Sequence, residues 1–261
     1  MAERGGAVAA LAARLRDGRP LITAWSGIAE PAVAGILAGE PGFDAVVLDM
    51  QHGAHDVASV TRSVPLIAAR GKPTIARVPV GAFNTVSRMF DAGVSAVIAP
   101  MVNSVEDARL FAGFAKFPPL GERSWGPLPA LALSGLSGDQ YLKEANGLCL
   151  TLAMIETRAA LDAIDGILGV EGIDGVFIGP SDLSIALSGG AGLDPDGAAT
   201  RAALDHVLAR ARAAGKHIGV YSHSGPRARE LAGQGFDLIA LASDVGLLRA
   251  GVQAALKEAR G

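Results

Sequence analysis

The sequence predicts an α/β fold in which eight parallel strands, each followed by a helix, close into a (β/α)₈ barrel. Short apolar runs alternate with longer amphipathic stretches along the chain. The short runs are apolar almost throughout, which is typical of parallel strands covered on both faces. Eight such units fit one domain spanning residues 1–261. A doubly wound open sheet is the alternative, but it needs a glycine-rich nucleotide turn after the first strand, and Trp25-Ser-Gly-Ile-Ala29 is a poor one.

Each predicted element follows from this alternation. The strands are expected at Leu21–Ala24, Ala45–Asp49, Thr74–Arg77, Ala96–Pro100, Cys149–Ile155, Gly175–Ile178, His217–Tyr221 and Leu238–Ala242. The helices are expected at Pro31–Ala38, Val57–Ala69, Phe83–Phe90, Val105–Phe114, Ala159–Leu168, Ala198–Ala214, Pro226–Ala232 and Val245–Ala259. A further helix is expected to begin near Asp182, beyond the sixth strand.

Composition excludes several classes of protein. The net charge is −3 and no basic stripe occurs, so no nucleic-acid partner is expected. The apolar runs are strand-sized, well below the ~20 residues that span a membrane, so no membrane partner is expected either. The residues after Met1 lack the features of a signal peptide. Cys149 is the single cysteine and lies in an apolar run, where an inert buried thiol is expected. A soluble cytoplasmic protein is the simplest expectation.

One long segment interrupts the alternation. Residues Phe117–Pro129 are rich in proline and glycine and follow the fourth strand and its helix. Unusually long loops in compact domains are often functional. A surface excursion or a contact between subunits is an equally good interpretation.

In a (β/α)₈ barrel the catalytic groups gather at the carboxyl ends of the strands. The sequence therefore predicts one rim that collects acids, imidazoles and an arginine. Its members are Asp49, Gln51, His52, His55, Asp56, Arg77, Glu156, Asp182, Tyr221, Ser222, His223, Ser243 and Asp244.

Glu156 and Asp182 are the candidate metal ligands of this rim. Each closely follows a buried strand, and hard divalent cations prefer oxygen ligands. Two carboxylates with several waters would suit Mg²⁺ or Mn²⁺, with Co²⁺ as a further candidate, whereas a His/Cys cage for zinc is absent from the sequence. The competing interpretation is a helix N-cap for Asp182 and a solvated loop acid for Glu156.

Arg77 and His52 are the candidate groups for substrate binding and proton transfer. A guanidinium at a strand end must find an anion, either a substrate oxygen or a neighbouring acid. An imidazole has a near-neutral pKa that suits proton transfer, although a lone histidine is equally often structural. His55 and His223 are weaker candidates of the same kind.

The lysines limit the mechanism. None of the five lysines is expected at the carboxyl end of a strand, where a Schiff base with substrate would form. Carbonyl chemistry at this rim would therefore need a metal as the electron sink. The lysines are Lys72, Lys116, Lys143, Lys216 and Lys257.

Several motifs together resemble the HpcH/HpaI aldolase family, metal-dependent class II aldolases that act on 2-oxo acids. They cover nearly the whole chain, and each alone is weak. The motifs are Asp49-Met-Gln-His52, Ala76-Arg-Val-Pro79, Phe90-Asp-Ala-Gly93, Ala99-Pro-Met-Val102, Met154-Ile-Glu-Thr157 and Ile178-Gly-Pro-Ser-Asp-Leu-Ser184. The resemblance implies the barrel, a divalent cation, and reversible addition of a pyruvate-type donor to an aldehyde. It also suggests a homo-oligomer, a hexamer.

The resemblance assigns roles to particular residues. Glu156 and Asp182 match the metal carboxylates, and Arg77 matches the arginine at the donor's keto oxygen. His52 and Asp91 match a His–Asp dyad for proton transfer. The segment Gly179, Pro180 and Ser181 matches the backbone that holds the donor carboxylate, a placement that helix N-termini favour.

At three positions the family's residue roles cannot be carried over directly to this chain. Gln51 and Met154 stand where the family often has Glu and Gln, which changes charge and hydrogen bonding near the donor. Asp91 ends a helix just before the fourth strand, so its own barrel would place it near the amino face, away from His52. We therefore expect Asp91 to reach a neighbouring subunit's site; the competing interpretation is a local cap, with Asp49 orienting His52.

The expected function is aldol addition of pyruvate or hydroxypyruvate to an aldehyde, and the reverse cleavage of 4-hydroxy-2-oxo acids. A citrate-lyase-like or malyl-CoA-type lyase is the nearest alternative, for which Arg123 is a candidate phosphate ligand. A catalytically silent barrel that binds 2-oxo acids or serves as an assembly subunit is the alternative of a different class.

Overall fold

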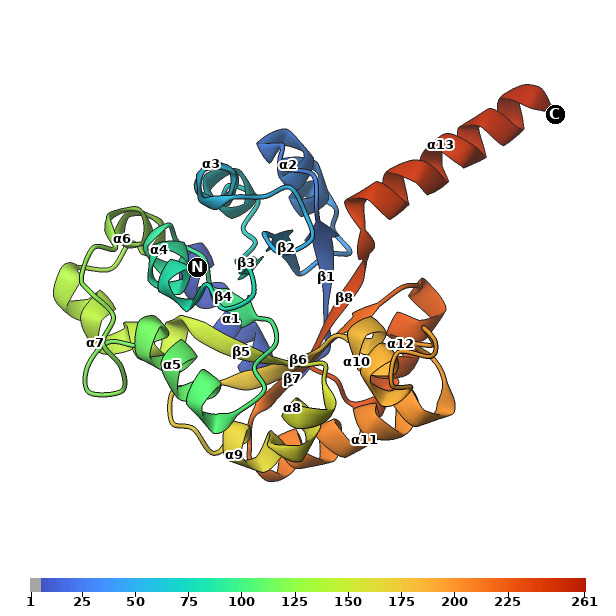
Figure 1. The fold of residues 1–261 in the computed structure, drawn as a ribbon. Coiled ribbons are helices and arrows are strands. Elements are labelled where there is room, and N and C mark those ends of the chain that lie inside the picture. Colours follow the sequence, from blue (N-terminus) through green and yellow to red (C-terminus); the bar gives the residue numbers. More distant parts are fainter. Residues whose placement is uncertain (1–5) are drawn as a thin grey trace.

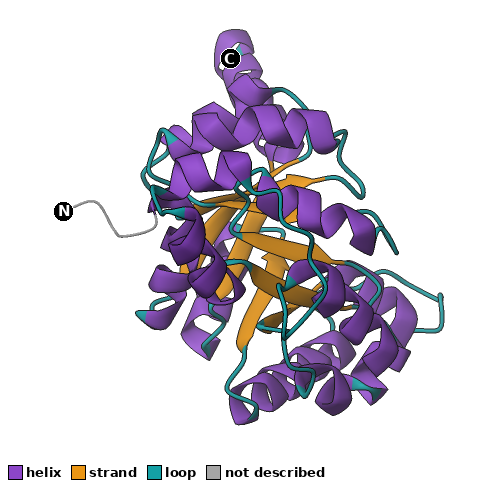
Figure 2. Cartoon of the chain, turned by 90° about the vertical axis from the view of Figure 1, so that its left-hand side faces the viewer, coloured by secondary structure: helices purple, strands orange, loops and turns teal. Residues whose placement is uncertain are grey.

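The protein is a closed barrel of eight parallel strands surrounded by helices, as Figures 1 and 2 show for a computed structural model that describes residues 6–261. The strands are β1 (Leu21–Ser26), β2 (Ala45–Asp49), β3 (Thr74–Arg77), β4 (Ala96–Ala99), β5 (Leu150–Ile155), β6 (Gly175–Ile178), β7 (His217–Ser222) and β8 (Leu238–Ser243). The last strand pairs with the first, Leu21 opposite Leu238, which confirms the barrel and excludes the open sheet. Predicted strand bounds hold for β2, β3 and β6 and differ elsewhere by one or two residues.

Most predicted helices are present. They are α2 (Pro31–Gly39), α3 (Val57–Ala68), α4 (Val86–Asp91) after the 3₁₀ turn η1 (Phe83–Thr85), α5 (Val105–Ala115), α11 (Ala198–Ala213), α12 (Gly225–Gln234) and α13 (Asp244–Arg260). The helix expected over 159–168 is instead two short ones, α8 (Arg158–Asp162) and α9 (Ile164–Leu168). The helix expected near Asp182 is α10 (Pro180–Leu187), with Pro180 at its first position.

Three helices were not predicted: α1 (Gly6–Arg16), α6 (Leu128–Ser134) and α7 (Gly138–Leu148). Glycine or proline within or beside each one weakens the local helix signal, so packing decides them. Helix α7 does have a local start signal, a capping box formed by Ser137 and Gln140, which the prediction from alternating strands and helices did not use.

Alternate strand residues point into the barrel and pack into one apolar cluster. It includes Leu21, Val47, Ile75, Ile98, Leu152, Phe177 and Leu238. Leu11, Ala12 and Leu15 of α1 belong to the same cluster. The unpredicted α1 therefore closes the amino end of the barrel and leaves the carboxyl end open.

Three aspartates clamp the amino end of the barrel. Asp44, Asp174 and Asp237 each stand immediately before a strand, β2, β6 or β8. Each carboxylate accepts a backbone N–H from the neighbouring strand, from Ile22 at 2.9 Å, Thr151 at 2.8 Å and Ile218 at 2.9 Å. Each also pairs with a cation, respectively Arg19, Lys116 and Arg212.

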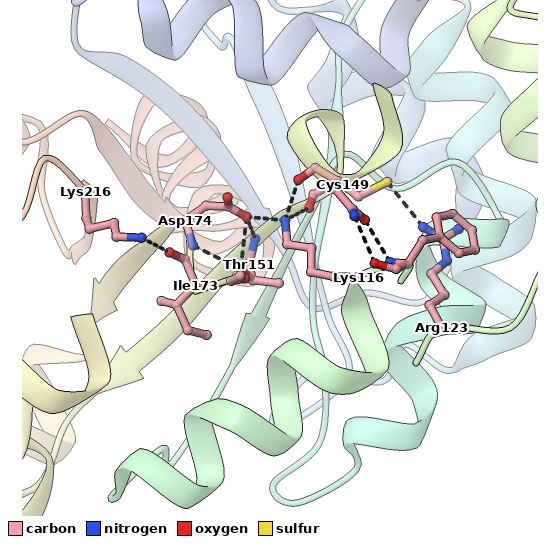
Figure 3. Close-up of polar contacts among 10 residues, drawn as sticks. Lys116, Arg123, Cys149, Thr151, Ile173, Asp174 and Lys216 are labelled. Carbon is pink, nitrogen blue, oxygen red and sulfur yellow. Dashed lines mark hydrogen bonds and ion pairs between the residues drawn. The ribbon is translucent and has the colours of Figure 1, made fainter. Parts of the chain in front are cut away.

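The long segment after α5 is fixed at this same end by two buried cations (Figure 3). The Lys116 side chain is 1% exposed, and its Nζ donates to Asp174 Oδ2 at 2.6 Å and to the Cys149 carbonyl at 2.7 Å. Arg123 is stacked on Phe117, with Cζ 4.5 Å from the ring centroid. The segment expected to be a functional loop or a surface excursion is thus anchored on the face opposite the open mouth. Cys149 itself is buried, as predicted.

The C-terminal helix α13 projects away from the barrel (Figure 1). Its apolar residues Val245, Leu248, Val252 and Leu256 are spaced three or four apart, so they share one face, and all four are exposed. Among residues 6–261, no helix has both the length and the hydrophobicity needed to cross a membrane.

Candidate active site

A cavity of about 540 Å³ opens at the carboxyl end of the barrel. It brings together most of the predicted rim. Its lining includes Asp49, His52, Arg77, Asp182, Tyr221, His223, Ser243 and Asp244, with Gly179, Pro180 and Ser181 beside them. Five predicted rim residues do not line it: Gln51, Asp56 and Ser222, together with His55 and Glu156, which are buried behind it.

Strand geometry explains why charged side chains occupy this mouth. Residues at alternate positions face inward, so the apolar interior continues upward into Trp25, Asp49, Arg77 and Met154. Asp49 and Arg77 are register partners on β2 and β3. Arg77 donates from Nε to Asp49 Oδ1 at 2.8 Å and from Nη2 to Oδ2 at 2.6 Å.

Arg77 is therefore paired with a neighbouring acid and also faces the cavity. Burial alone would raise the pKa of Asp49, but Arg77 and the N–H groups of Gln51 and His52 lower it below its ordinary value. The carboxylate stays charged and holds the guanidinium in one orientation. Trp25, which sequence reasoning missed, fixes the pair further: its indole N–H donates to Asp49 Oδ2 at 3.3 Å, and Arg77 Cζ lies 4.8 Å from its ring centroid. Its inward position at the end of the first strand was the available signal.

Glu156 lies directly behind the cavity wall and is 1% exposed. Its Oε1 accepts the Met101 N–H at 2.9 Å, whereas its Oε2 is buried with no hydrogen-bond partner. Burial above all, and then the nearby Asp182 carboxylate, raise the pKa of Glu156 to about 7. Asp182 is exposed, in the first turn of α10. It does not occupy the N-cap position, which belongs to Gly179.

These two carboxylates fit a divalent cation. An unpartnered buried oxygen beside a second acid is a costly arrangement that a bound cation would relieve. Within residues 6–261 no group of three or more His, Cys, Asp or Glu side chains is placed to hold a metal. Two carboxylates would leave further coordination positions to water and substrate oxygens, which suits Mg²⁺ or Mn²⁺ better than zinc.

Gly179 makes this wall tight. A Cβ there would lie 2.6 Å from both Glu156 Oε2 and Met154 Cε. Pro180 lines the cavity but has no N–H to donate, so the backbone donors of this turn begin at Ser181. The Ser181 hydroxyl lies 3.2 Å from His223 Nε2.

The structure separates the two members of the predicted dyad within one chain. His52 is exposed and lines the cavity. Asp49 Oδ1 accepts the backbone N–H of His52 at 3.3 Å, so Asp49 holds the main chain rather than the ring. Asp91 ends α4, is 25% exposed, and accepts from Arg123 Nη2 at 2.7 Å. It lines a different surface depression, with Arg88 and Pro129.

The residues expected of a CoA lyase or a Schiff-base enzyme are elsewhere. The Arg123 side chain is 0% exposed, ion-paired with Asp91, and so cannot grip a phosphate. No lysine lines the cavity among the described residues.

Comparison with known proteins identifies the family. The model of the HpcH/HpaI aldolase/citrate lyase family matches residues 21–250. The chain belongs to the HpcH/HpaI aldolase/citrate lyase family. It is 39% identical over 245 residues to a hydroxypyruvate/pyruvate aldolase of Rhizorhabdus wittichii, covering 94% of this chain and 96% of the relative. It is 34% identical to a 4-hydroxy-2-oxo-heptane-1,7-dioate aldolase of Salmonella paratyphi C, covering 92% and 90%.

The fold agrees. The crystal structure of an HpcH/HpaI aldolase/citrate lyase family protein from Burkholderia cenocepacia superposes with a TM-score of 0.87 at 29% identity, covering 97% of this chain and 100% of that one. Family, relatives and barrel confirm that the protein is an enzyme of the aldolase type, a carbon–carbon lyase.

Proposed function

We propose that this protein is a divalent-metal-dependent aldolase that adds pyruvate or hydroxypyruvate to an aldehyde and, in reverse, cleaves 4-hydroxy-2-oxo acids. The observation that carries this proposal is the unpartnered Oε2 of Glu156, buried behind the wall of a cavity that presents the nearby Asp182 together with Arg77 and His52. Two relatives bearing these donor and product names support the substrate class. The acceptor aldehyde would enter from the open mouth.

Glu156 and Asp182 would hold the cation, Mg²⁺, Mn²⁺ or Co²⁺. When bound, it supplies a Lewis acid that draws electrons from the donor carbonyl and acidifies the neighbouring C–H. The Arg77 guanidinium, kept in place by Asp49 and Trp25, donates to the keto oxygen and stabilises the negative charge that develops there. The N–H groups from Ser181 onward, at the N-terminus of α10, bind the donor carboxylate.

His52 would move the proton. Its ring is exposed to the cavity on the side of β2, next to the Asp49–Arg77 pair. It takes a proton from the donor carbon and returns one to the acceptor's new hydroxyl group. No lysine lines the described cavity, so an iminium route has no support.

We further propose that the active form is a homo-oligomer in which Asp91 serves the His52 of a neighbouring subunit. The exposed apolar face of α13 supports association, and Asp91 lines a depression other than the cavity of its own chain, which favours a role in a second copy. The hexameric state and the cytoplasmic location stay predictions. Mixing Asp91→Asn with His52→Ala protein, each strongly impaired alone, is expected to restore activity in hetero-oligomers; no recovery would show that Asp91 acts locally.

Exchange of the pyruvate methyl protons in D₂O tests the core of the proposal, because it needs no acceptor. We expect exchange with Mg²⁺ or Mn²⁺, none after EDTA, and none for Glu156→Ala. Full exchange by Glu156→Ala in EDTA would overturn the metal scheme.

A panel of 4-hydroxy-2-oxo acids, with malyl-CoA alongside, then separates the aldolase from the CoA-type lyase, for which the buried Arg123 offers no support.

A further inference from the structure

Asp244 is a buried carboxylate that the reaction scheme does not use. It begins α13 directly after β8, touches the edge of the cavity, and is 4% exposed. None of the ion pairs among the described residues includes it. A buried charge without a cation must be offset by hydrogen bonds.

The bonds that offset this charge come mainly from the turn after β1. Asp244 accepts the Gly27 N–H at 3.0 Å to each oxygen and the Ile28 N–H at 2.9 Å. The Ser26 hydroxyl donates to Oδ2 at 3.0 Å, and the Val245 N–H donates to Oδ1 at 2.8 Å. The carboxylate thus fixes the turn 26–28 to the end of β8.

The same turn holds the segment that follows His52. The Ala54 N–H donates to the Gly27 carbonyl at 2.8 Å. The buried His55 ring contacts the Ser26 hydroxyl through Nε2 at 3.1 Å and Ser59 through Nδ1 at 3.2 Å. A Cβ on Gly53 would lie 2.8 Å from Gly27 Cα, so the two turns are packed backbone to backbone.

We propose that Asp244 is a positioning residue for His52, acting through the turn 26–28 and the His55 ring. On the amino side His52 is held by Asp49 through its backbone N–H. On the carboxyl side the fixed points are Ala54 and His55, and both rest on the turn that Asp244 holds. Because the proposal assigns the control of His52, it depends on the proton-transfer role proposed above for that histidine.

The isosteric change Asp244→Asn tests the role sharply. Both oxygens accept backbone N–H groups, so every orientation of the amide points its NH₂ at a donor. The turn should shift without creating a cavity. Asp237→Asn is the control, because it makes the same change on a partly buried carboxylate that accepts a backbone N–H at the other end of β8, although Asp237 also pairs with Arg212.

The measurement is pyruvate proton exchange by the Mg²⁺-loaded enzyme, with kcat and KM obtained separately. We expect Asp244→Asn to lower kcat by about 10–100-fold, the range for residues that orient a working side chain. KM for pyruvate should stay within about twofold, because Arg77 and Ser181 do not contact Asp244. Asp237→Asn should leave kcat of the folded protein unchanged.

A double-mutant cycle separates positioning from general damage. In a His52→Ala background, Asp244→Asn is expected to change exchange by less than about twofold, because the group it positions is gone. The same loss with and without His52, or no loss in the single variant, would overturn the proposal. If Asp244→Asn does not fold, Ser26→Ala enters the same cycle, since it removes the hydroxyl that joins Asp244 to His55. If His52→Ala itself exchanges normally, the proton-transfer role fails first and this proposal with it.

Discussion

The two ends of the barrel use the same kinds of residue in opposite ways. At the amino end, Asp44, Asp174 and Asp237 are each paired with a cation and a backbone N–H. At the carboxyl end, Glu156 leaves one oxygen unpartnered and Asp182 faces the cavity. An acid with every partner supplied stabilises the fold, whereas an acid that lacks a partner is available to a ligand. The set of partners that an acid has, more than its residue type, therefore distinguishes a structural carboxylate from one that is available to a ligand.

The largest effect expected at the mouth is on activity. Glu156→Gln should lower pyruvate exchange and aldol cleavage by about 10³-fold or more, the order of effect for a group that supports transition-state charge. Stability should not fall, because the variant removes a buried carboxylate whose pKa is already raised to about 7 by burial. Thermal unfolding beside single-turnover kinetics checks both. A clear loss of stability at unchanged rate would place Glu156 with the structural acids.

His52→Gln should have the next effect at the mouth, a loss of about 10²–10⁴-fold in kcat, the usual contribution of a general acid–base. Pyruvate binding should change little, since Arg77 and Asp49 keep their contacts. Calorimetric titration of pyruvate with the metal present measures binding apart from rate. His223→Gln is the comparison variant, and an equal loss in both would indicate that neither histidine is specific to proton transfer.

At the amino end the expected effect is on stability. Lys116→Met leaves the Asp174 carboxylate without its cation and should lower the free energy of unfolding by about 3 kcal/mol, at the low end for breaking a buried pair because Asp174 keeps some exposure. The folded fraction should retain its kcat. Urea unfolding and a rate normalised to folded protein test this. A fall in kcat of the folded protein would contradict the view that the amino end of the barrel serves stability and the carboxyl end serves catalysis.

The smallest expected effect is a pH dependence behind the mouth. Burial lowers the pKa of His55 from its ordinary 6.5, against the opposing charges of Asp244, Asp49 and Asp56. The unfolded chain therefore takes up this proton first as pH falls, so the contribution of His55 to stability is fully present above about pH 6.5 and is lost below it. His55→Gln should remove this slope between about pH 7 and 5. An unchanged slope in the variant would assign it to other groups.

The sequence predicted the barrel because short, near-continuous apolar runs that alternate with amphipathic stretches mark parallel strands and their helices locally. It also predicted that Arg77 ends a strand, that Glu156 directly follows one and that Asp182 begins a helix beyond one, and the structure places them at the end of β3, after β5 and in the first turn of α10. What it missed depends on partners far away in the chain. Helix α1 is stabilised by the interior it closes, and Trp25 matters through Asp49 and Arg77, which lie one and two strands further along the chain.

Burial of charge was the least predictable feature. Arg123 resembled an exposed loop cation in the sequence, yet it is enclosed by Asp91 and two phenylalanine rings, Phe90 and Phe117. Nothing local in a proline-rich segment shows that it folds back onto the barrel floor. The pairing of Lys116 with Asp174, 58 positions apart, is hidden for the same reason.

The three aspartates at the amino end also have a consequence for the register between neighbouring strands of the barrel. Strands that tilt to close a barrel are staggered, so their ends are not level with one another. At each offset, a strand residue is left with a backbone N–H that has no partner on the neighbouring strand. Ile22, Thr151 and Ile218 are the second residues of β1, β5 and β7, opposite the acids that precede β2, β6 and β8. Slipping any of these pairs by one residue would expose that N–H and misplace the acid. The aspartate before a strand therefore helps to fix the register of that strand with its neighbour. It recurs before every even-numbered strand except β4, where Ser95 stands instead. The three tripeptides are Phe43-Asp-Ala45, Ile173-Asp-Gly175 and Phe236-Asp-Leu238.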